Sequence, residues 1–424
     1  IPMIELLNII YIIFFSLVIL SFDFSESLII KLNLKKLSII EKFSINIILF
    51  CLVFLIISFI EMNYKILNYF LFLISLISLL INYKNNFLLQ SNNRINLVIF
   101  FIIIFVLSCD IIANPKLEWD GHSWYFHALN FYENFKFFNL EGTSFQHYPH
   151  LGGFIWSFFW NISLLDQESF GRIGYIVIYA ISILCVSENV SKNLYIKLLF
   201  TLVLIFSTYD KFLFGGYQAY LIFSIILILC NLINKFKIKD LNFFQITFII
   251  FSSNLLIWVK NEGIFYYIFF LIFIFFHSSL NKKIYIIFLG SSLLLIKFFM
   301  MSQISDVNSF DISQLEINFD YEFYLKIKLI LTHIVVASFK YPIWLIFFLT
   351  LFVKRIEKDS FYIFYFLFFS FLLIFLIFLI PGAGNSKWTE WYVTGALDRI
   401  MFHLSAFLII FISSRVKYLI KSFA

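Results

Sequence analysis

Apolar residues follow one another along almost the whole chain in runs of roughly 17–25 residues, separated by shorter polar stretches. A run of this length is enough to cross the hydrocarbon core of a bilayer as an α-helix. The pattern therefore predicts a succession of membrane-spanning helices. They fall at about residues 5–21, 45–61, 65–82, 96–113, 170–187, 197–209, 216–233, 242–258, 263–280, 284–300, 326–352, 361–380 and 399–414.

We predict an all-α integral membrane protein, a polytopic bundle of about 12–14 transmembrane helices. Neither a fixed-period repeat nor a soluble domain interrupts the pattern, so residues 1–424 are expected to form a single transmembrane domain. Within it we distinguish N-terminal helices (1–113), a large extracytoplasmic loop (114–169) that carries a short interfacial helix, and the remaining helices (170–424).

Basic residues recur in every second loop, and short loops rich in lysine and arginine stay in the cytoplasm. The alternate loops, 62–64, 114–169, 209–215, 259–262, 301–325 and 381–398, are therefore expected outside. The loop at 301–325 is acidic. This alternation also puts residue 1 outside, which suggests that a further helix precedes it.

The alternation holds only if segment 151–165 does not cross the membrane. That segment is short for a span and carries two tryptophans, so a helix in or dipping into the outer interface fits it better. If it does cross, every later loop changes side and the lysine-rich loops face outward.

Composition agrees with the membrane assignment. Hydrophobic residues make up 62% of the chain, charged residues 13%, and the mean hydropathy is +0.94, whereas a soluble domain is about 25% charged. The net charge of +6 is spread over many loops, so it reflects membrane orientation and indicates no nucleic-acid partner. The four cysteines show no C-x-x-C spacing, which indicates neither a zinc site nor a disulfide framework.

Candidate chemistry is concentrated in the loop from Glu118 to His150. Glu118 and Asp120 are two residues apart at the start of a possible helix, whose dipole keeps a carboxylate ionised. Such an ionised aspartate is a competent general base. With Glu118 or His122, Asp120 could also hold a divalent cation such as Mg²⁺ or Mn²⁺. His127, His147 and His150 could join this site, although their spacing matches no zinc motif.

Two later outer junctions also carry ionisable residues, which are costly at membrane depth and are often kept for function. Lys260 and Glu262 lie between two predicted spans, and Asp398 with Arg399 begins the last. Each pair also has a structural interpretation that involves no function. Lys260 and Glu262 could snorkel or pair with each other, and Asp398-Arg399 could be a local cap or an orientation charge.

Several short motifs, taken in order, resemble the GT-C superfamily of polytopic membrane glycosyltransferases. Trp119-Asp120-Gly121, followed by Trp124-Tyr125 and Ala128, resembles the acidic motif of that superfamily's first outer loop. The later matches are His147-Tyr148-Pro149-His150-Leu151 to a Y-P-P-L element, Gly171-Arg172 to an arginine at the next span, Lys260-Asn261-Glu262-Gly263 to a K-N-E-G element, and Leu397-Asp398-Arg399 to a late arginine motif.

The resemblance implies inverting transfer of a sugar from a polyprenyl-phosphate donor to a lipid, glycan or protein acceptor. Asp120 would be the catalytic carboxylate, with Glu118 as its partner. Substrate-binding residues would be His122, His147, His150, Lys260, Glu262 and Arg399, of which Lys260 or Arg399 would hold the phosphate. The expected location is the bacterial inner (plasma) membrane, with the active site facing the periplasm or exterior.

Two other functions share these features. A transporter or flippase of lipid-linked oligosaccharide would also have many helices, but ionisable residues near span centres are scarce and no inverted pair of broken helices is evident. A surface-polysaccharide polymerase or ligase would use the same class of substrate through a later outer loop.

Overall fold

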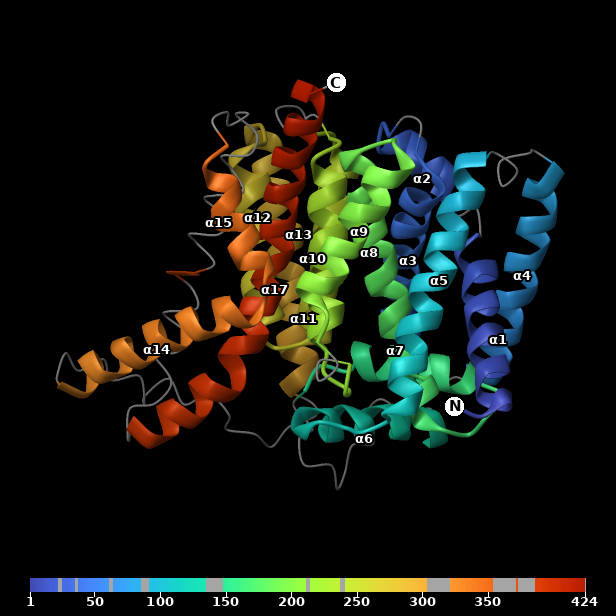
Figure 1. The fold of residues 1–424 in the computed structure, drawn as a ribbon, viewed down its shortest axis with the longest axis horizontal. Coiled ribbons are helices and arrows are strands. Elements are labelled where there is room, and N and C mark those ends of the chain that lie inside the picture. The colour runs from blue at the N-terminus through green and yellow to red at the C-terminus, as the bar shows by residue number, and fades with distance from the viewer. Residues whose placement is uncertain are drawn as a thin grey trace. The chain divides into compact units, whose positions relative to one another are not determined.

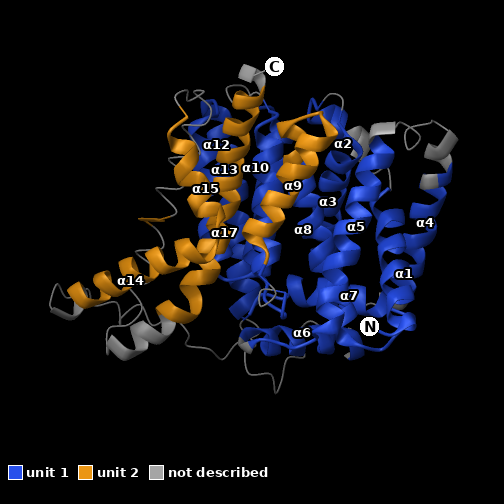
Figure 2. Cartoon of the chain, viewed as in Figure 1, with its two compact units in different colours: residues 1–185, 210–305 blue, residues 186–209, 306–424 orange. Residues whose placement is uncertain are grey.

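The structure is a computed structural model that describes residues 1–21, 25–34, 37–60, 64–84, 91–134, 148–210, 214–236, 241–302, 321–353, 371–372 and 386–423. Every regular element among these residues is a helix. The chain divides into two compact units, each described by itself. Unit 1 comprises Ile1–Cys185 and Asp210–Ser305, and unit 2 comprises Val186–Tyr209 and Asp306–Ala424 (Figure 2). The expectation of one continuous domain stays a prediction.

Unit 1 holds most of the described helices (Figure 1). They are α1 (Met3–Leu20), α2 (Ser25–Lys31), α3 (Ile39–Ile57), α4 (Tyr64–Lys84), α5 (Ser91–Ala113), α6 (Trp119–Asn134), α7 (Leu151–Ile162), a 3-10 turn (Glu168–Phe170), most of α8 (Ile173–Val190), α10 (Ala219–Ile233), α11 (Phe243–Val259), α12 (Gly263–Phe276) and α13 (Leu280–Ser302). Unit 2 holds the end of α8 together with α9 (Leu194–Thr208), α14 (Tyr321–Lys340), α15 (Ile343–Leu351) and α17 (Ser386–Phe423).

The ends of two helices are set by polar caps that the apolar pattern does not reveal. Ser38 accepts a hydrogen bond from the Glu41 amide, and the Glu41 side chain accepts one from the Ser38 amide. Asn242 and Gln245 form the same reciprocal cap on α11. Such a box satisfies two backbone donors that a helix start leaves open, so α3 begins at Ile39 rather than at the predicted residue 45.

Six described helices are long and apolar enough to cross a membrane, which indicates an integral multi-pass membrane protein. They are Met3–Leu20, Ile39–Ile57, Asn93–Ala113, Glu168–Val190, Leu280–Ser302 and Val393–Ile420. Five further apolar helices are only 10–17 residues long, namely Ile66–Ser78, Leu194–Thr208, Ala219–Ile233, Phe243–Val259 and Gly263–Phe276. The predicted span at 361–380 lies outside the described residues except for 371–372.

The predicted span at 326–352 is not one straight helix. The chain bends by 95° between α14 and α15, at Tyr341 and Pro342. Proline has no backbone N–H to donate, and its ring collides with the carbonyl four residues earlier, so a straight helix cannot pass through it. A single broken span or a re-entrant loop both fit this geometry, and counting the pair as one span raises the number of candidates to seven.

The two helices of the long outer loop lie at one end of unit 1. Figure 1 shows α6 lying across the ends of the other helices of the unit. Helix α7 is buried along its whole length except at Asn161, so the predicted interfacial helix is covered by protein on its sides. Arg172, just before α8, bonds to the Pro115 carbonyl just after α5. The ends of α5 and α8 are therefore adjacent, as the non-crossing reading of 151–165 requires.

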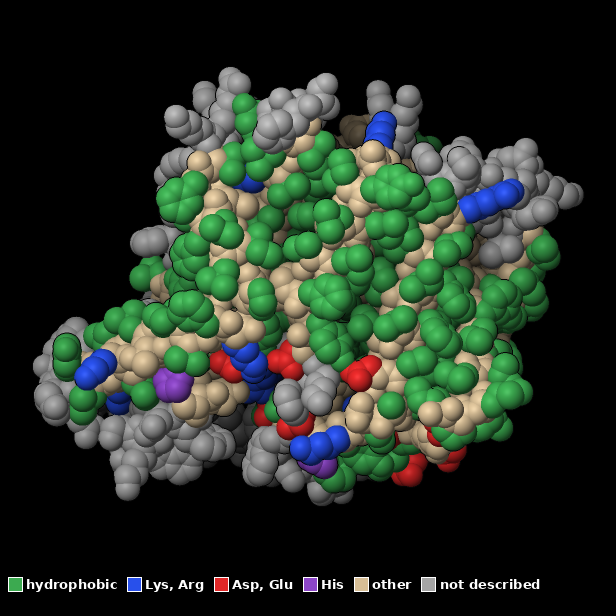
Figure 3. Space-filling view, in the orientation of Figure 1, with side chains coloured by type: hydrophobic (Ala, Val, Ile, Leu, Met, Phe, Trp, Pro, Cys, Tyr) green, Lys and Arg blue, Asp and Glu red, His purple; other side chains and the backbone are tan. Residues whose placement is uncertain are grey.

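Side-chain chemistry differs between the flanks and the ends of unit 1. Hydrophobic side chains cover the flanks of its helices, whereas charged side chains gather at the end where α6 lies (Figure 3). On α4 the exposed side chains are large and apolar, including Tyr69, Phe70, Leu73, Ile77 and Leu80. A soluble protein exposes mainly polar side chains, whereas these exposed apolar side chains suit contact with lipid tails.

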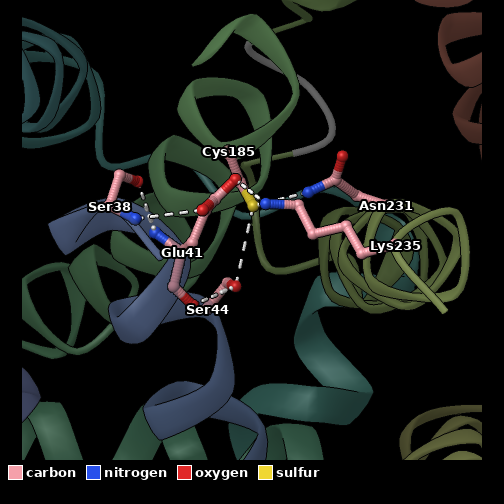
Figure 4. Close-up of polar contacts among 6 residues, drawn as sticks. All are labelled: Ser38, Glu41, Ser44, Cys185, Asn231 and Lys235. Atoms are coloured by element: carbon pink, nitrogen blue, oxygen red, sulfur yellow. Dashed lines mark hydrogen bonds and ion pairs between the residues drawn. The ribbon is translucent and has the colours of Figure 1, made fainter. Parts of the chain in front are cut away.

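The other end of unit 1 is fastened by a buried polar cluster (Figure 4). Lys235, just beyond α10, forms an ion pair with Glu41 of α3, whose side chain is only 6% exposed. Asn231 donates to the Cys185 sulfur, and that thiol lies 3.6 Å from the Ser44 hydroxyl. The cluster thus joins α3, α8 and α10, about 26 Å along α3 from the end that carries α6.

Candidate functional site

The start of α6 is fixed by a very close approach of two backbone segments. The Glu118 amide donates to the Gly215 carbonyl at 3.0 Å. A methyl group added at Gly121 would lie 2.1 Å from that same carbonyl oxygen. Gly216 has a φ of +100°, and a methyl group there would lie 2.8 Å from the Gly121 Cα. Only glycine tolerates both the close contact at Gly121 and the positive φ at Gly216. The Gly215-Gly216 turn is therefore closely packed against the first turn of α6.

A buried arginine clamps the same two segments. The Arg172 guanidinium donates to the carbonyls of Pro115 at 2.7 Å and Phe214 at 3.3 Å. It also forms an ion pair with Glu168 at 3.0 Å. Because the guanidinium is planar and carries five donors, one side chain can hold several acceptors in fixed directions. Arg172 therefore positions the entry to α6 without belonging to it.

The acidic residues at this entry remain accessible. The Glu118 carboxylate is 23% exposed and lies 3.5 Å from the Lys116 ammonium, whose side chain is 78% exposed. Such an exposed pair contributes little stability. Burial, and then the charges of Glu118 and Asp210, raise the pKa of Tyr217 above its ordinary value. Glu118 and Asp210 therefore both lie near Tyr217.

Asp120 lies at the open end of an otherwise buried face of α6. Trp124, His127 and Phe131 follow it at spacings of four, three and four residues, and such positions share one face of a helix. These three side chains are almost completely buried, while Asp120 is half-buried. Asp120 and His127 are about 10 Å apart along the axis of α6. The carboxylate therefore stands where a buried face meets the surface.

A second group of polar side chains lies deeper in unit 1, around His150. The imidazole is fully buried, and its Nε2 lies 2.6 Å from the Ser58 hydroxyl. The rings of Phe59 and Trp258 flank it edge-on, with centroid distances of 5.0 and 5.4 Å. Burial, and then the nearby Lys297 and His127, hold the pKa of His150 well below its ordinary value. This imidazole is neutral at pH 7.

Lys297 is a residue that the sequence analysis overlooked. Its ammonium nitrogen lies 4.3 Å from the centre of the Trp258 ring, and the side chain is buried. A sequence signal for it exists, because Lys297 is the only charged residue in the predicted span 284–300. A lone charge in an apolar span marks a functional site by default.

The other predicted substrate-binding residues have separate surroundings. Lys260 and Glu262 pair with each other at 3.1 Å, as their structural interpretation anticipated. His122 is exposed on α6. Arg399 is half-buried in α17 of unit 2, next to Asp398, which pairs with Lys340 at 2.8 Å. His147 lies outside the described residues.

A metal site is not assembled within the described part of the chain. No three or more of its histidine, cysteine, aspartate and glutamate side chains come close enough together to hold an ion. Glu118, Asp120 and His122 are therefore not a ready-made set of ligands. A cation at Asp120 stays a prediction from the sequence.

The site thus consists of Asp120 and Glu118 at a braced helix start, with His150 and Lys297 deeper in the same unit. Comparison of this chain with models of known protein families, with curated proteins and with solved structures finds no match.

Proposed function

We propose that this protein is a membrane glycosyltransferase with about 12–14 transmembrane helices. It would transfer a sugar from a polyprenyl-phosphate donor to a lipid, glycan or protein acceptor on the outer face of a bacterial plasma membrane. The motifs around Asp120 suggest the superfamily. Asp120 is the proposed catalytic carboxylate, and Glu118 is its partner.

One observation carries the proposal: Asp120 occupies the first turn of a helix that is braced on its backbone and lies across the end of apolar helices. The helix dipole favours the ionised carboxylate. The Arg172 and Gly215 contacts restrict where the start of α6 can move, and fixed position is a large part of what a catalytic group contributes. The apolar flanks of unit 1 would let a polyprenyl chain approach from the bilayer.

In the proposed reaction Asp120 accepts a proton from the acceptor hydroxyl or amine. The acceptor atom attacks C1 of the sugar while the bond from C1 to the lipid-phosphate oxygen breaks. The electron pair of that bond leaves with the phosphate. A single displacement of this kind inverts the configuration at C1. A cationic side chain would stabilise the negative charge of the departing phosphate. Lys260 and Arg399 are the candidates that the superfamily resemblance implies.

The direct test replaces Asp120 with asparagine, which keeps the shape and removes the base. We expect D120N to lower sugar transfer by about 10²–10⁴-fold, the usual contribution of a general base. Glu133→Gln is the matched control, because Glu133 is an exposed acid at the far end of the same helix. Transfer is measured with radiolabelled polyprenyl-phosphate sugar in proteoliposomes, and unchanged thermal unfolding confirms folding. A folded D120N that transfers sugar normally would rule out Asp120 as the base.

The alternative, a transporter or flippase of lipid-linked oligosaccharide, is favoured by one observation. Lys297 is a buried charge within an apolar helix, as in many transport pathways. The same proteoliposomes discriminate between the two functions. Movement of a lipid-linked glycan across the bilayer by both wild type and D120N, with no transfer by either, would replace the transferase proposal. A surface-polysaccharide polymerase or ligase would instead show transfer to a growing glycan.

A further inference from the structure

Lys297 lacks a counter-ion in the described part of the chain. Its nitrogen is buried and has no hydrogen-bond acceptor there. None of the described carboxylates lies within 4.0 Å of it. Removing an ammonium group from water without pairing it is very unfavourable. The ring of Trp258 compensates only in part, through its negative face.

Two histidines lie in the region of this ammonium. Lys297 and His127 both help to lower the pKa of His150, and an imidazole is neutral or cationic, so neither histidine supplies an anion. His150 in turn contacts the Ser58 hydroxyl. Ser58 also donates to the Leu55 carbonyl at 2.7 Å, so its oxygen is left to accept the Nε2 proton of His150. His150 and Ser58 thus bond to each other, and neither places a negative charge beside Lys297.

A second buried donor lies on α6. The indole nitrogen of Trp124 is buried and has no acceptor among the described residues. Trp124 lies one helical turn before His127, with ring centroids 5.8 Å apart. Buried donors are nearly always paired in folded proteins. Trp124 contacts His127, which like Lys297 lies near His150, so one region of unit 1 holds two buried donors that lack an acceptor among the described residues.

We propose that unit 1 contains a buried oxyanion site in which Lys297 binds a phosphate group. The phosphate supplies the negative charge and the acceptor oxygens that the ammonium lacks, since a lysine binds phosphate as a point charge. It could be carried on a lipid that enters from the bilayer or be free in solution. The site does not depend on Asp120 being catalytic, and it is separate from Lys260 and its partner Glu262.

The test measures anion binding by the full-length protein in phosphatidylcholine nanodiscs. Inorganic phosphate and dodecyl phosphate are the two probes, and the readouts are the unfolding temperature and ³¹P NMR line width. We expect at least one probe to raise the unfolding temperature of the wild type. In K297M, affinity for that probe should fall at least about tenfold, as expected for loss of a charged hydrogen bond, whereas K297R retains binding.

The matched control is K283M. Lys283 lies near the start of the same helix and also sits over an aromatic ring, that of Phe275 at 5.0 Å, so K283M should respond to the probes as the wild type does. Without any anion, K297M should be at least as stable as the wild type, because it removes an unpaired buried charge. A response to dodecyl phosphate alone identifies a lipid-borne phosphate, and a response to both probes identifies a site open to the free ion.

Three results would overturn the proposal: no response of the wild type to either probe, an equal response of K297M, or a K297M chain that is less stable than the wild type or does not fold. The last would make Lys297 a structural cation. D120N separates this proposal from the transferase. It should bind the probe normally, whether or not Asp120 is needed for sugar transfer.

Discussion

His150 is the residue whose charge the fold constrains most directly. The sequence presents it as one of several loop histidines, with nothing to distinguish it from His122 or His147. In the structure His122 is exposed, whereas His150 is enclosed by aromatic rings and bonded to Ser58. The difference arises because α3, α6 and α11 pack around the start of α7. The local sequence pattern cannot predict this packing.

This burial predicts a pH dependence of stability. The unfolded chain binds a proton at the ordinary histidine pKa of about 6.5, while folded His150 has a lower pKa and stays neutral. Between the two values the unfolded state holds more protons. Stability therefore falls as pH drops below about 6.5, by up to about 1.4 kcal/mol per pH unit from this one group.

The unfolding temperature of the detergent-solubilised protein, measured between about pH 7.5 and pH 5, checks this expectation. Replacing His150 with glutamine should flatten the acid side of the curve, because glutamine cannot gain the charge. His122→Gln changes an exposed histidine of α6 and should leave the curve as it is. An H150Q protein with the wild-type pH dependence would show that another group is responsible.

Lys297 shows how a residue can be visible in the sequence and still be missed. It interrupts a long apolar run, which is a clear signal on its own. Charged residues are dense in the loops and scarce at the centres of the predicted spans, so the predicted site was confined to the loops and span ends. The packing of Lys297 over Trp258 then required the structure, because the two residues lie on different helices.

Among the elements, α6 begins at a very close contact between two backbone segments. Its first turn lies directly against Gly215, with no room for a side chain at Gly121. The sequence predicted a helix after the acidic residues, and α6 begins at Trp119. It could not predict the partner segment, because the Gly215-Gly216 turn follows only after further helices. Likewise Pro342 was visible, yet the apolar pattern on both sides of it masked the break between α14 and α15.

The space around two glycines predicts opposite effects for their replacement by alanine. G121A places a methyl group 2.1 Å from the Gly215 oxygen, so α6 must shift, which we expect to destabilise the protein by about 1–3 kcal/mol and to impair the Asp120 site. Gly395, in α17, has no atom within 4 Å of an added methyl group. G395A should therefore be neutral or stabilising by up to about 1 kcal/mol.

Thermal unfolding of the two variants beside the wild type measures both effects. Probe binding and sugar transfer by G121A then report whether the start of α6 has moved. Equal unfolding temperatures for G121A and wild type would mean that the Gly215-Gly216 turn can shift at little cost in stability. The contact would then not fix the position of the start of α6.

At the scale of the whole molecule, the apolar pattern predicted the helical membrane class and most of the helix positions. Residues 96–113 and 284–300, for example, fall within α5 and α13, and 242–258 differs from α11 by one residue at each end. Hydrophobic length is a strong signal because a membrane demands that every backbone polar group be paired within the helix. The pattern says little about which helices touch, since lipid tails and neighbouring helices are similarly apolar.

Orientation is the whole-molecule feature that remains a prediction from loop charge. Lys116, whose side chain is 78% exposed, should lie outside, and the exposed Asn281, next to Lys282 and Lys283, should lie inside. A membrane-impermeant maleimide should therefore label K116C in intact cells and N281C only after permeabilisation.

The unaltered chain is the control for this experiment, because its own cysteines are buried or half-buried. The reverse pattern would put the α6 end of unit 1 in the cytoplasm. Labelling of both positions in intact cells would contradict the helix-by-helix alternation itself.

The clamp around Arg172 also has a consequence for how the protein is made. A ribosome releases the chain from its N-terminus, so Glu118 and Asp120 emerge before Arg172 and well before Phe214 and Gly215. For that interval the contacts from Arg172, Phe214 and Gly215 are missing, and they form only after the later helices have entered the membrane. The α6 end of unit 1 is thus assembled late, so under the proposed function an incomplete nascent chain would lack a fixed catalytic carboxylate.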